Sequence, residues 1–137
     1  HAGSIPAPGT ILSKDQIKEP QMKQIIKFDQ APLKKNSTTC EVNEYMFNQP
    51  GLGVARAVIN GRYPVEQDKK VINSACDIIY FVLGGSGTIY TNNGSFKAEK
   101  NDAIFLVRGE WYWVEGSNFE VLVISAPEWT AEQYKEI

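Results

Sequence analysis

Short apolar segments separated by turn residues make up most of this chain. Glycine, asparagine and aspartate interrupt it at residues 84–87, 92–94, 100–102 and 116–118 and around Gly109. The segments are rich in β-branched and aromatic residues, which favour strands. Strands are predicted at residues 23–28, 40–47, 52–60, 77–83, 87–91, 95–99, 102–107, 111–115 and 119–125. Their regular spacing predicts an all-β protein, a sandwich or barrel of antiparallel strands.

Two capping signals predict short helical segments near the ends of the chain. Ser13 stands three residues before Gln16, and Pro20 would end the helix that this pair begins. The same spacing recurs in Thr130–Gln133, where a helix is predicted to run towards Tyr134. At this spacing a serine or threonine and a glutamine can each satisfy a free backbone donor of the other's residue.

Both faces of the segment at residues 77–83 are apolar. Residues two apart in a strand share a face, so Ile78 defines one row and Ile79 the other. The first row is Cys76, Ile78, Tyr80 and Val82, and the second is Ile79, Phe81 and Leu83. A strand with two apolar faces is covered on both sides. Either other elements of the chain cover the second row, or it lies in a subunit interface, and we expect a homodimer.

Length and composition indicate one ordinary globular domain. The chain has 137 residues, of which 42% are hydrophobic and 22% charged. We expect residues 1–12 to form a flexible lead-in and residues 13–137 a single domain. The net charge of −2 provides no strongly positive field, which argues against nucleic acid or a membrane surface as partner.

Histidine and cysteine counts restrict the possible chemistry. The only histidine is His1, and the only cysteines are Cys40 and Cys76. One chain therefore cannot assemble a zinc site of three or four histidine and cysteine ligands, nor place a serine-histidine-acid triad in its core. Cys76 has no histidine nearby to activate it, so we expect reduced, unreactive thiols and a cytoplasmic protein.

Residues 76–129 resemble the conserved barrel of the cupin superfamily. The motifs that carry the resemblance are an apolar strand leading into Gly85-Ser86-Gly87, a two-residue hairpin at Asn93-Gly94, Asn101-Asp102 before another apolar strand, Gly109 in an aromatic turn, and Gly61 where the first motif opens. The resemblance implies a double-stranded β-helix, also called a jelly-roll barrel, in its small single-domain form. It also implies a dimer, because such domains commonly pair.

The metal-ligand positions of the family carry other residues in this sequence. Counting from Gly85 puts Ile78 at the glutamate position, and counting from Gly109 puts Tyr112 at the third histidine position. The first two histidine positions fall on Val71 and Asn73, or on Ile72 and Ser74.

A register counted from Gly84 would keep one carboxylate, Asp77, with Lys70 and Ile72 at the histidine positions. One carboxylate does not replace imidazole as a ligand for first-row metals. We therefore expect no metal and no cofactor.

Tyrosine side chains occupy places in the barrel where a guest molecule would be bound. Tyr80 and Tyr112 would act as hydrogen-bond donors and stacking surfaces, since phenols stay protonated at neutral pH, although both could equally be core residues. Glu110 shares the row of Tyr112. Trp111 and Trp113 lie on the opposite row, where we expect packing or interface roles.

Arg56 and Asn73 are the remaining candidates for ligand binding. Arg56 lies between Ala55 and Ala57 in an apolar strand, and a buried arginine requires a carboxylate partner or an anionic ligand. One interpretation is that Arg56 binds a small carboxylate ligand. The alternative is that Arg56 faces the surface or pairs internally, with Glu44 or Glu110 as a plausible partner. The Asn73 amide could contact a polar ligand, or cap a loop.

These residues predict a metal-free barrel that binds a small apolar or carboxylated molecule as a sensor or carrier. The expected ligand-binding residues are Arg56, Asn73, Tyr80, Glu110 and Tyr112. One alternative is a metal-independent isomerase or lyase acting on a sugar or keto acid, with Glu110 as acid or base and Tyr112 as donor. The other is a structural module that only dimerises.

Overall fold

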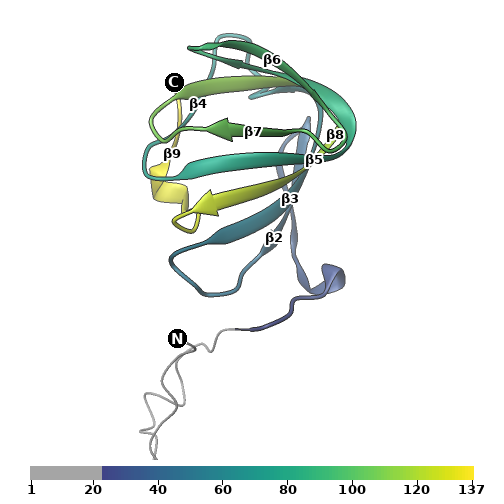
Figure 1. Cartoon of the computed structure of the whole chain (residues 1–137), viewed down its shortest axis with the longest axis vertical. Helices are drawn as coiled ribbons and strands as arrows, with labels where there is room; N and C mark the ends of the chain where they lie inside the picture. The colour runs from purple at the N-terminus through teal and green to yellow at the C-terminus, as the bar shows by residue number, and fades with distance from the viewer. Residues whose placement is uncertain (1–22) are drawn as a thin grey trace, which may run out of the picture.

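The computed structural model describes residues 23–137, in which antiparallel strands curl into a barrel (Figure 1). The strands are β1 (Leu33–Ser37), β2 (Cys40–Tyr45), β3 (Gly53–Tyr63), β4 (Val71–Asn73), β5 (Asp77–Thr91), β6 (Gly94–Glu99), β7 (Ala103–Leu106), β8 (Trp111–Ala126) and β9 (Tyr134–Glu136). Two short 3-10 helices, η1 (Phe28–Gln30) and η2 (Ala131–Gln133), complete the fold. The predicted all-β barrel is confirmed.

Strand pairing is antiparallel throughout and is organised around the two longest strands. One path through the sheet runs β1-β2-β3-β8-β4-β9, and β5 pairs with β6, β7 and β8. Strand β8 pairs with β3, β4 and β5, so it joins these three strands in one sheet. No helix in residues 23–137 is long and apolar enough to cross a membrane.

Strands β5 and β8 continue through two predicted breaks, which is a correction to the sequence analysis. Glycine at these positions lets each strand bend and lets the backbones approach closely, so the strand continues and does not end in a turn. A Cβ atom on Gly85, where φ is +64°, would lie 1.9 Å from the Asn118 carbonyl oxygen. On Gly87 it would lie 2.7 Å from the Phe119 ring, and on Gly116 it would lie 2.4 Å from the carbonyl oxygen of Ile59.

The predicted hairpin at the Asn93-Gly94 turn exists but is shifted by one residue. Thr91 pairs with Gly94, so the two loop residues are Asn92 and Asn93. Gly94 has a φ of +124° and neither loop asparagine has a positive φ, so the turn is not of type I′.

Several elements at the two ends of the chain differ from their predictions. Residues 23–28 form no strand, and the short strands β1, β4 and β9 were not predicted. The C-terminal helix is one 3-10 turn, in which the Thr130 side chain makes no capping hydrogen bond, and Tyr134 begins a strand instead of continuing the helix. The capping pair Ser13 and Gln16 and the expected lead-in lie outside the described residues.

The predicted alternation of strand β5 is confirmed. Its inner row is buried, with exposed fractions of 1% for Cys76, 2% for Ile78, 4% for Tyr80 and 0% for Val82. The outer row of Ile79, Phe81 and Leu83 is only partly buried. The described part of the chain therefore does not cover the outer face completely.

Gly116→Ala should destabilise the fold, because its Cβ would collide with the backbone of Ile59 and with Phe119. We expect the free energy of unfolding to fall by about 1–3 kcal/mol, the usual range for overpacking, as measured by urea denaturation. Gly51→Ala is the matched control, since nothing lies within 4 Å of the place that its Cβ would take. Equal stability of the two variants would contradict the role given to Gly116.

Candidate functional site

A cavity of about 130 Å³ opens on the inner face of strands β2, β3, β5 and β8. The segment that follows β8 also borders this cavity. Aromatic rings account for much of its lining, namely Tyr45, Tyr63, Tyr80, Tyr112, Trp129 and Tyr134. The charged and amide side chains that line it are Asn36, Glu44, Asn73 and Glu128. The sheet thus encloses a small, mostly apolar space with a few polar groups, as binding sites for small molecules usually do.

The Asn73 amide holds three parts of the cavity wall together. Its oxygen accepts hydrogen bonds from Trp129 Nε1 at 3.1 Å and from Gln133 Nε2 at 2.8 Å. Its nitrogen donates to the Tyr112 hydroxyl at 3.2 Å. Asn73 is 4% exposed, and its backbone oxygen accepts a bond from the Gly109 N–H. Asn73 lines the cavity as expected, but its amide is largely occupied by these contacts and positions the wall.

A second polar chain joins the cavity to the protein surface. The Tyr134 hydroxyl donates to a Glu136 carboxylate oxygen at 3.0 Å, and the hydroxyls of Tyr63 and Tyr134 lie 2.6 Å apart. Because Tyr134 has a single hydroxyl hydrogen, Tyr63 is the donor in the shorter bond. The oxygen of Tyr63 keeps acceptor capacity on the cavity side.

Tyr80 and Tyr112 meet edge to face in the cavity wall. Their ring centroids are 6.2 Å apart and their planes are at 86°. Burial is the main cause that raises the pKa of both hydroxyls above the ordinary value of 10.0. Both phenols stay protonated at neutral pH and therefore serve as hydrogen-bond donors and not as bases.

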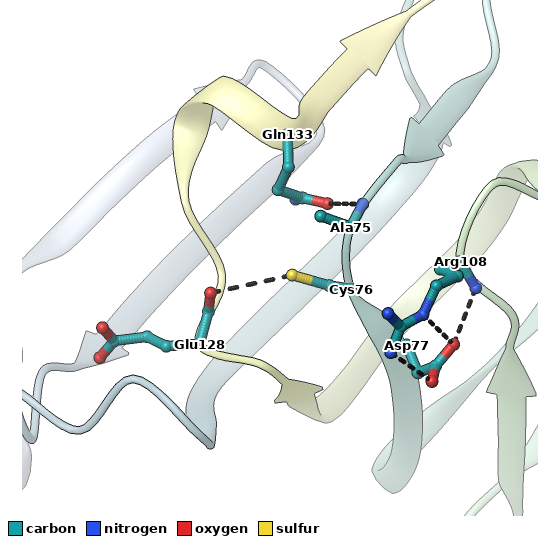
Figure 2. Close-up of polar contacts among 6 residues, drawn as sticks. All are labelled: Ala75, Cys76, Asp77, Arg108, Glu128 and Gln133. Carbon is teal, nitrogen blue, oxygen red and sulfur yellow. Dashed lines mark hydrogen bonds and ion pairs between the residues drawn. The ribbon is translucent and has the colours of Figure 1, made fainter.

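Both cysteines are buried, free and unreactive. Burial raises the pKa of Cys40 to about 12, and it also raises the pKa of Cys76. The Cys76 Sγ contacts the Glu128 carbonyl oxygen at 3.8 Å, beside the bond from the Ala75 N–H to the Gln133 side chain (Figure 2). A thiol held neutral in this way is a poor nucleophile.

The residues at the family's metal-ligand positions do not fit a transition metal. Val71 and Ile78 are buried hydrocarbons, the Asn73 oxygen already accepts two hydrogen bonds, and Tyr112 is a protonated phenol. Within residues 23–137 no group of three or more histidine, cysteine, aspartate and glutamate side chains could hold a metal ion.

The alternative register, with Asp77 as a ligand, is wrong. Asp77 forms an ion pair of 3.0 Å with Arg108 and also accepts a bond from the Arg108 backbone N–H, as Figure 2 shows. Hydrogen bonds from Arg108 are the main cause that lowers the pKa of this carboxyl. Asp77 is not among the residues that line the cavity.

Arg56 does not face the cavity, which corrects its assignment as a ligand-binding residue. Its Nε atom lies 2.5 Å from a Glu120 carboxylate oxygen, and its Nη1 atom donates to Asn43 at 3.3 Å. Its guanidinium also lies 5.6 Å from the centre of the Phe28 ring. Ala55 and Ala57 face the cavity, so alternation places Arg56 on the outer face. The alternative of an internally paired arginine is correct, with a partner that was not predicted.

Glu110 also lies outside the cavity. Its carboxylate accepts hydrogen bonds from the Asn93 side chain at 3.0 Å and from the Val107 backbone N–H at 3.1 Å. These contacts fix the turn before β8, and Glu110 is not among the residues that line the cavity. Its expected role as ligand contact or as acid and base is therefore not supported by its position.

Trp111 and Trp113 have the expected packing role on the outside of β8. Lys70 lies over the Trp111 ring at 4.1 Å, and Arg62 lies over the Trp113 ring at 4.4 Å. The opposite face of Trp113 stacks on Tyr90 at 3.9 Å.

Sequence reasoning missed several residues of the cavity wall. Tyr63 is 6% exposed and lines the interior. Trp129 and Tyr134 follow the last predicted strand, and the unpredicted pairing of β4 with β9 brings this segment to the barrel. Glu44 was considered only as a partner of Arg56, and Glu128 gave no signal in the sequence.

Comparisons with solved structures show the same fold in proteins of low sequence identity. A substituted form of PAC13 from Streptomyces, with uridine, has a TM-score of 0.74 at 19% identity, covering 84% of this chain and 91% of that one. Another PAC13 structure is described as that of a nucleoside dehydratase. KdgF from Halomonas sp. has a TM-score of 0.60 at 10% identity, covering 80% of this chain and 96% of that one. The cupin domain of Schizosaccharomyces pombe Cnp3 has a TM-score of 0.56 at 13% identity, with coverages of 74% and 72%. No protein-family profile and no curated protein sequence matches the chain.

The stability of the protein should fall as the pH rises above about 10. Unfolded tyrosines ionise near that value, whereas the raised pKa values keep Tyr80 and Tyr112 protonated in the folded state. The folded state then binds more protons than the unfolded state, so each such tyrosine lowers the free energy of unfolding by up to about 1.4 kcal/mol per pH unit. Urea denaturation between pH 9 and 11 measures the slope. The double variant Tyr80→Phe, Tyr112→Phe should have a shallower slope, and an unchanged slope would contradict the assignment.

Proposed function

We propose that this chain, which has the cupin fold, binds a small molecule in the aromatic cavity and acts as a sensor or carrier. The observation that carries the proposal is the prearranged wall, in which Asn73 fixes Tyr112 and Trp129 around an enclosed space. Two buried free thiols, Cys40 and Cys76, support a reducing compartment, and we place the protein in the cytoplasm.

The shape and polarity of the cavity favour a guest with an apolar or aromatic body and a few hydrogen-bonding groups. Rings such as Tyr80 provide stacking surface, and the Tyr63 oxygen can accept a hydrogen bond from the guest. The PAC13 structures with uridine support a guest that combines a flat ring with hydroxyl groups.

A carboxylated guest, the other class expected from the sequence, loses its support. That expectation depended on Arg56, which pairs with Glu120 on the outer face of the sheet. The described residues that line the cavity include Glu44 and Glu128 but neither lysine nor arginine. A carboxylate would therefore meet charges of its own sign.

A metal-independent isomerase or lyase is the weaker candidate. Its proposed acid or base, Glu110, is bound to Asn93 in a turn away from the cavity. The phenols of Tyr80 and Tyr112 do not replace it, because burial keeps them protonated.

Uridine and a library of small neutral aromatics test the proposal by thermal shift. A ligand at 100 times its dissociation constant should add about 2.7 kcal/mol to the stability. Tyr112→Phe should weaken the binding of a hydroxyl-bearing hit by about 2–10-fold, the value of one hydrogen bond. Tyr90→Phe is the control, since Tyr90 stacks on Trp113 outside the cavity. A library without a single hit would end the proposal.

We also propose that the protein forms a homodimer through the outer face of the sheet. Register places Ile124, Ile79 and Phe105 side by side across strands β8, β5 and β7. Phe105 is 55% exposed on this face, and the described residues leave the row only partly covered. A second copy would remove this apolar surface from water.

Phe105→Lys should shift the protein from dimer to monomer in sedimentation at micromolar concentration, because it places a charge within the apolar row. Phe96→Lys is the matched control. Phe96 is 45% exposed and pairs with the buried Ile89, so it belongs to the other face of the sheet. A wild-type protein that sediments as a monomer, or a dimer unaffected by Phe105→Lys, would contradict this interface.

A further inference from the structure

The charges around the cavity have one sign. Glu44 and Glu128 both contribute to its wall, on the side where strands β2 and β3 meet the segment after β8. Glu44 forms an ion pair with Lys34 at 3.2 Å, but the Lys34 side chain is 52% exposed and lies outside the lining. In residues 23–137 no side chain forms an ion pair with the Glu128 carboxylate.

The arginines of the described chain are engaged elsewhere and cannot balance these carboxylates. Arg56 pairs with Glu120, and Arg108 pairs with Asp77. Arg62 donates to backbone oxygens of the loop after β3, including Lys69 at 2.9 Å. Lys34 compensates Glu44, so the Glu128 carboxylate is the negative charge of the cavity wall that no ion pair within residues 23–137 balances.

Aromatic rings supply the second feature that attracts a positive charge. The faces of aromatic rings carry negative potential, and a cation within about 6 Å of a ring centre is attracted to it. Tyr63, Tyr80, Tyr112, Trp129 and Tyr134 all contribute to the cavity wall. Enclosure in this wall strengthens the attraction, because it removes water from between cation and ring.

We propose that the guest is a small organic cation, an ammonium group on an apolar body. The ammonium pairs with the Glu128 carboxylate, and the body lies against the tyrosine rings. This inference rests on the proposed function, since it names the class of molecule that the cavity binds. A cationic guest gains from both charge attraction and aromatic contact. A neutral molecule gains only from aromatic contact, and an anion is repelled.

Three probes that share one hydrocarbon body test the charge of the guest. Phenethylamine, 2-phenylethanol and phenylacetate are cationic, neutral and anionic at pH 7, and calorimetric titration gives their dissociation constants. We expect the amine to bind at least tenfold more tightly than the alcohol, and phenylacetate to bind most weakly. Glu128→Gln should reduce the affinity for the amine to about that for the alcohol without changing that for the alcohol.

Glu132→Gln is the matched control, because Glu132 is exposed and does not line the cavity. Thermal melting of each variant confirms folding. Glu44→Gln should have a smaller effect than Glu128→Gln, because Glu44 is already paired with Lys34. If the alcohol or phenylacetate binds as tightly as the amine, the cation proposal is overturned while small-molecule binding stands. If none of the three probes, uridine and the neutral library binds, both proposals are overturned.

Discussion

The barrel depends on close backbone contact of strand β8 with β5 and β3 at positions where only glycine fits. Gly85 lies against the Asn118 carbonyl, and Gly116 lies against that of Ile59. A side chain at either position would separate the strands, and the sheet could not bend within them. Because the strands bend without ending, β5 carries Tyr80 and β8 carries Tyr112 to one cavity. The site therefore follows from backbone sterics at residues that are not part of it.

One amide, that of Asn73, holds polar side chains in fixed positions inside the apolar barrel. Asn73 connects β8 through Tyr112 with the C-terminal segment through Trp129 and Gln133. A buried amide that makes all these bonds has little capacity left for a guest, but it makes the wall rigid before the guest arrives. Asn73 is thus a positioning residue.

Much of the fold was predictable from local pattern, whereas the cavity wall was not. The alternation that puts Ile78 and Tyr80 inside follows from the period of two in strands. Arg56 was misplaced because both faces of its strand are apolar, so alternation gave no clear answer. Its partner Glu120 depends on the register of β3 against β8, which bulges change and local sequence does not contain. Tyr134 comes from a segment with weak strand propensity that reaches the barrel only through pairing of β9 with β4.

The selectivity of such a cavity depends on the wall groups that are not already engaged in hydrogen bonds or ion pairs within the protein. The Asn73 amide is engaged within the wall, whereas burial keeps the phenols of Tyr80 and Tyr112 protonated, as hydrogen-bond donors. In the proposed complex, the free energy of binding comes from apolar contact with the rings, from such hydrogen bonds and from the Glu128 carboxylate. Apolar contact sets the size of the guest but discriminates poorly among bodies of similar size. In the proposed complex, the charge of Glu128 supplies the discrimination among guests that apolar contact lacks.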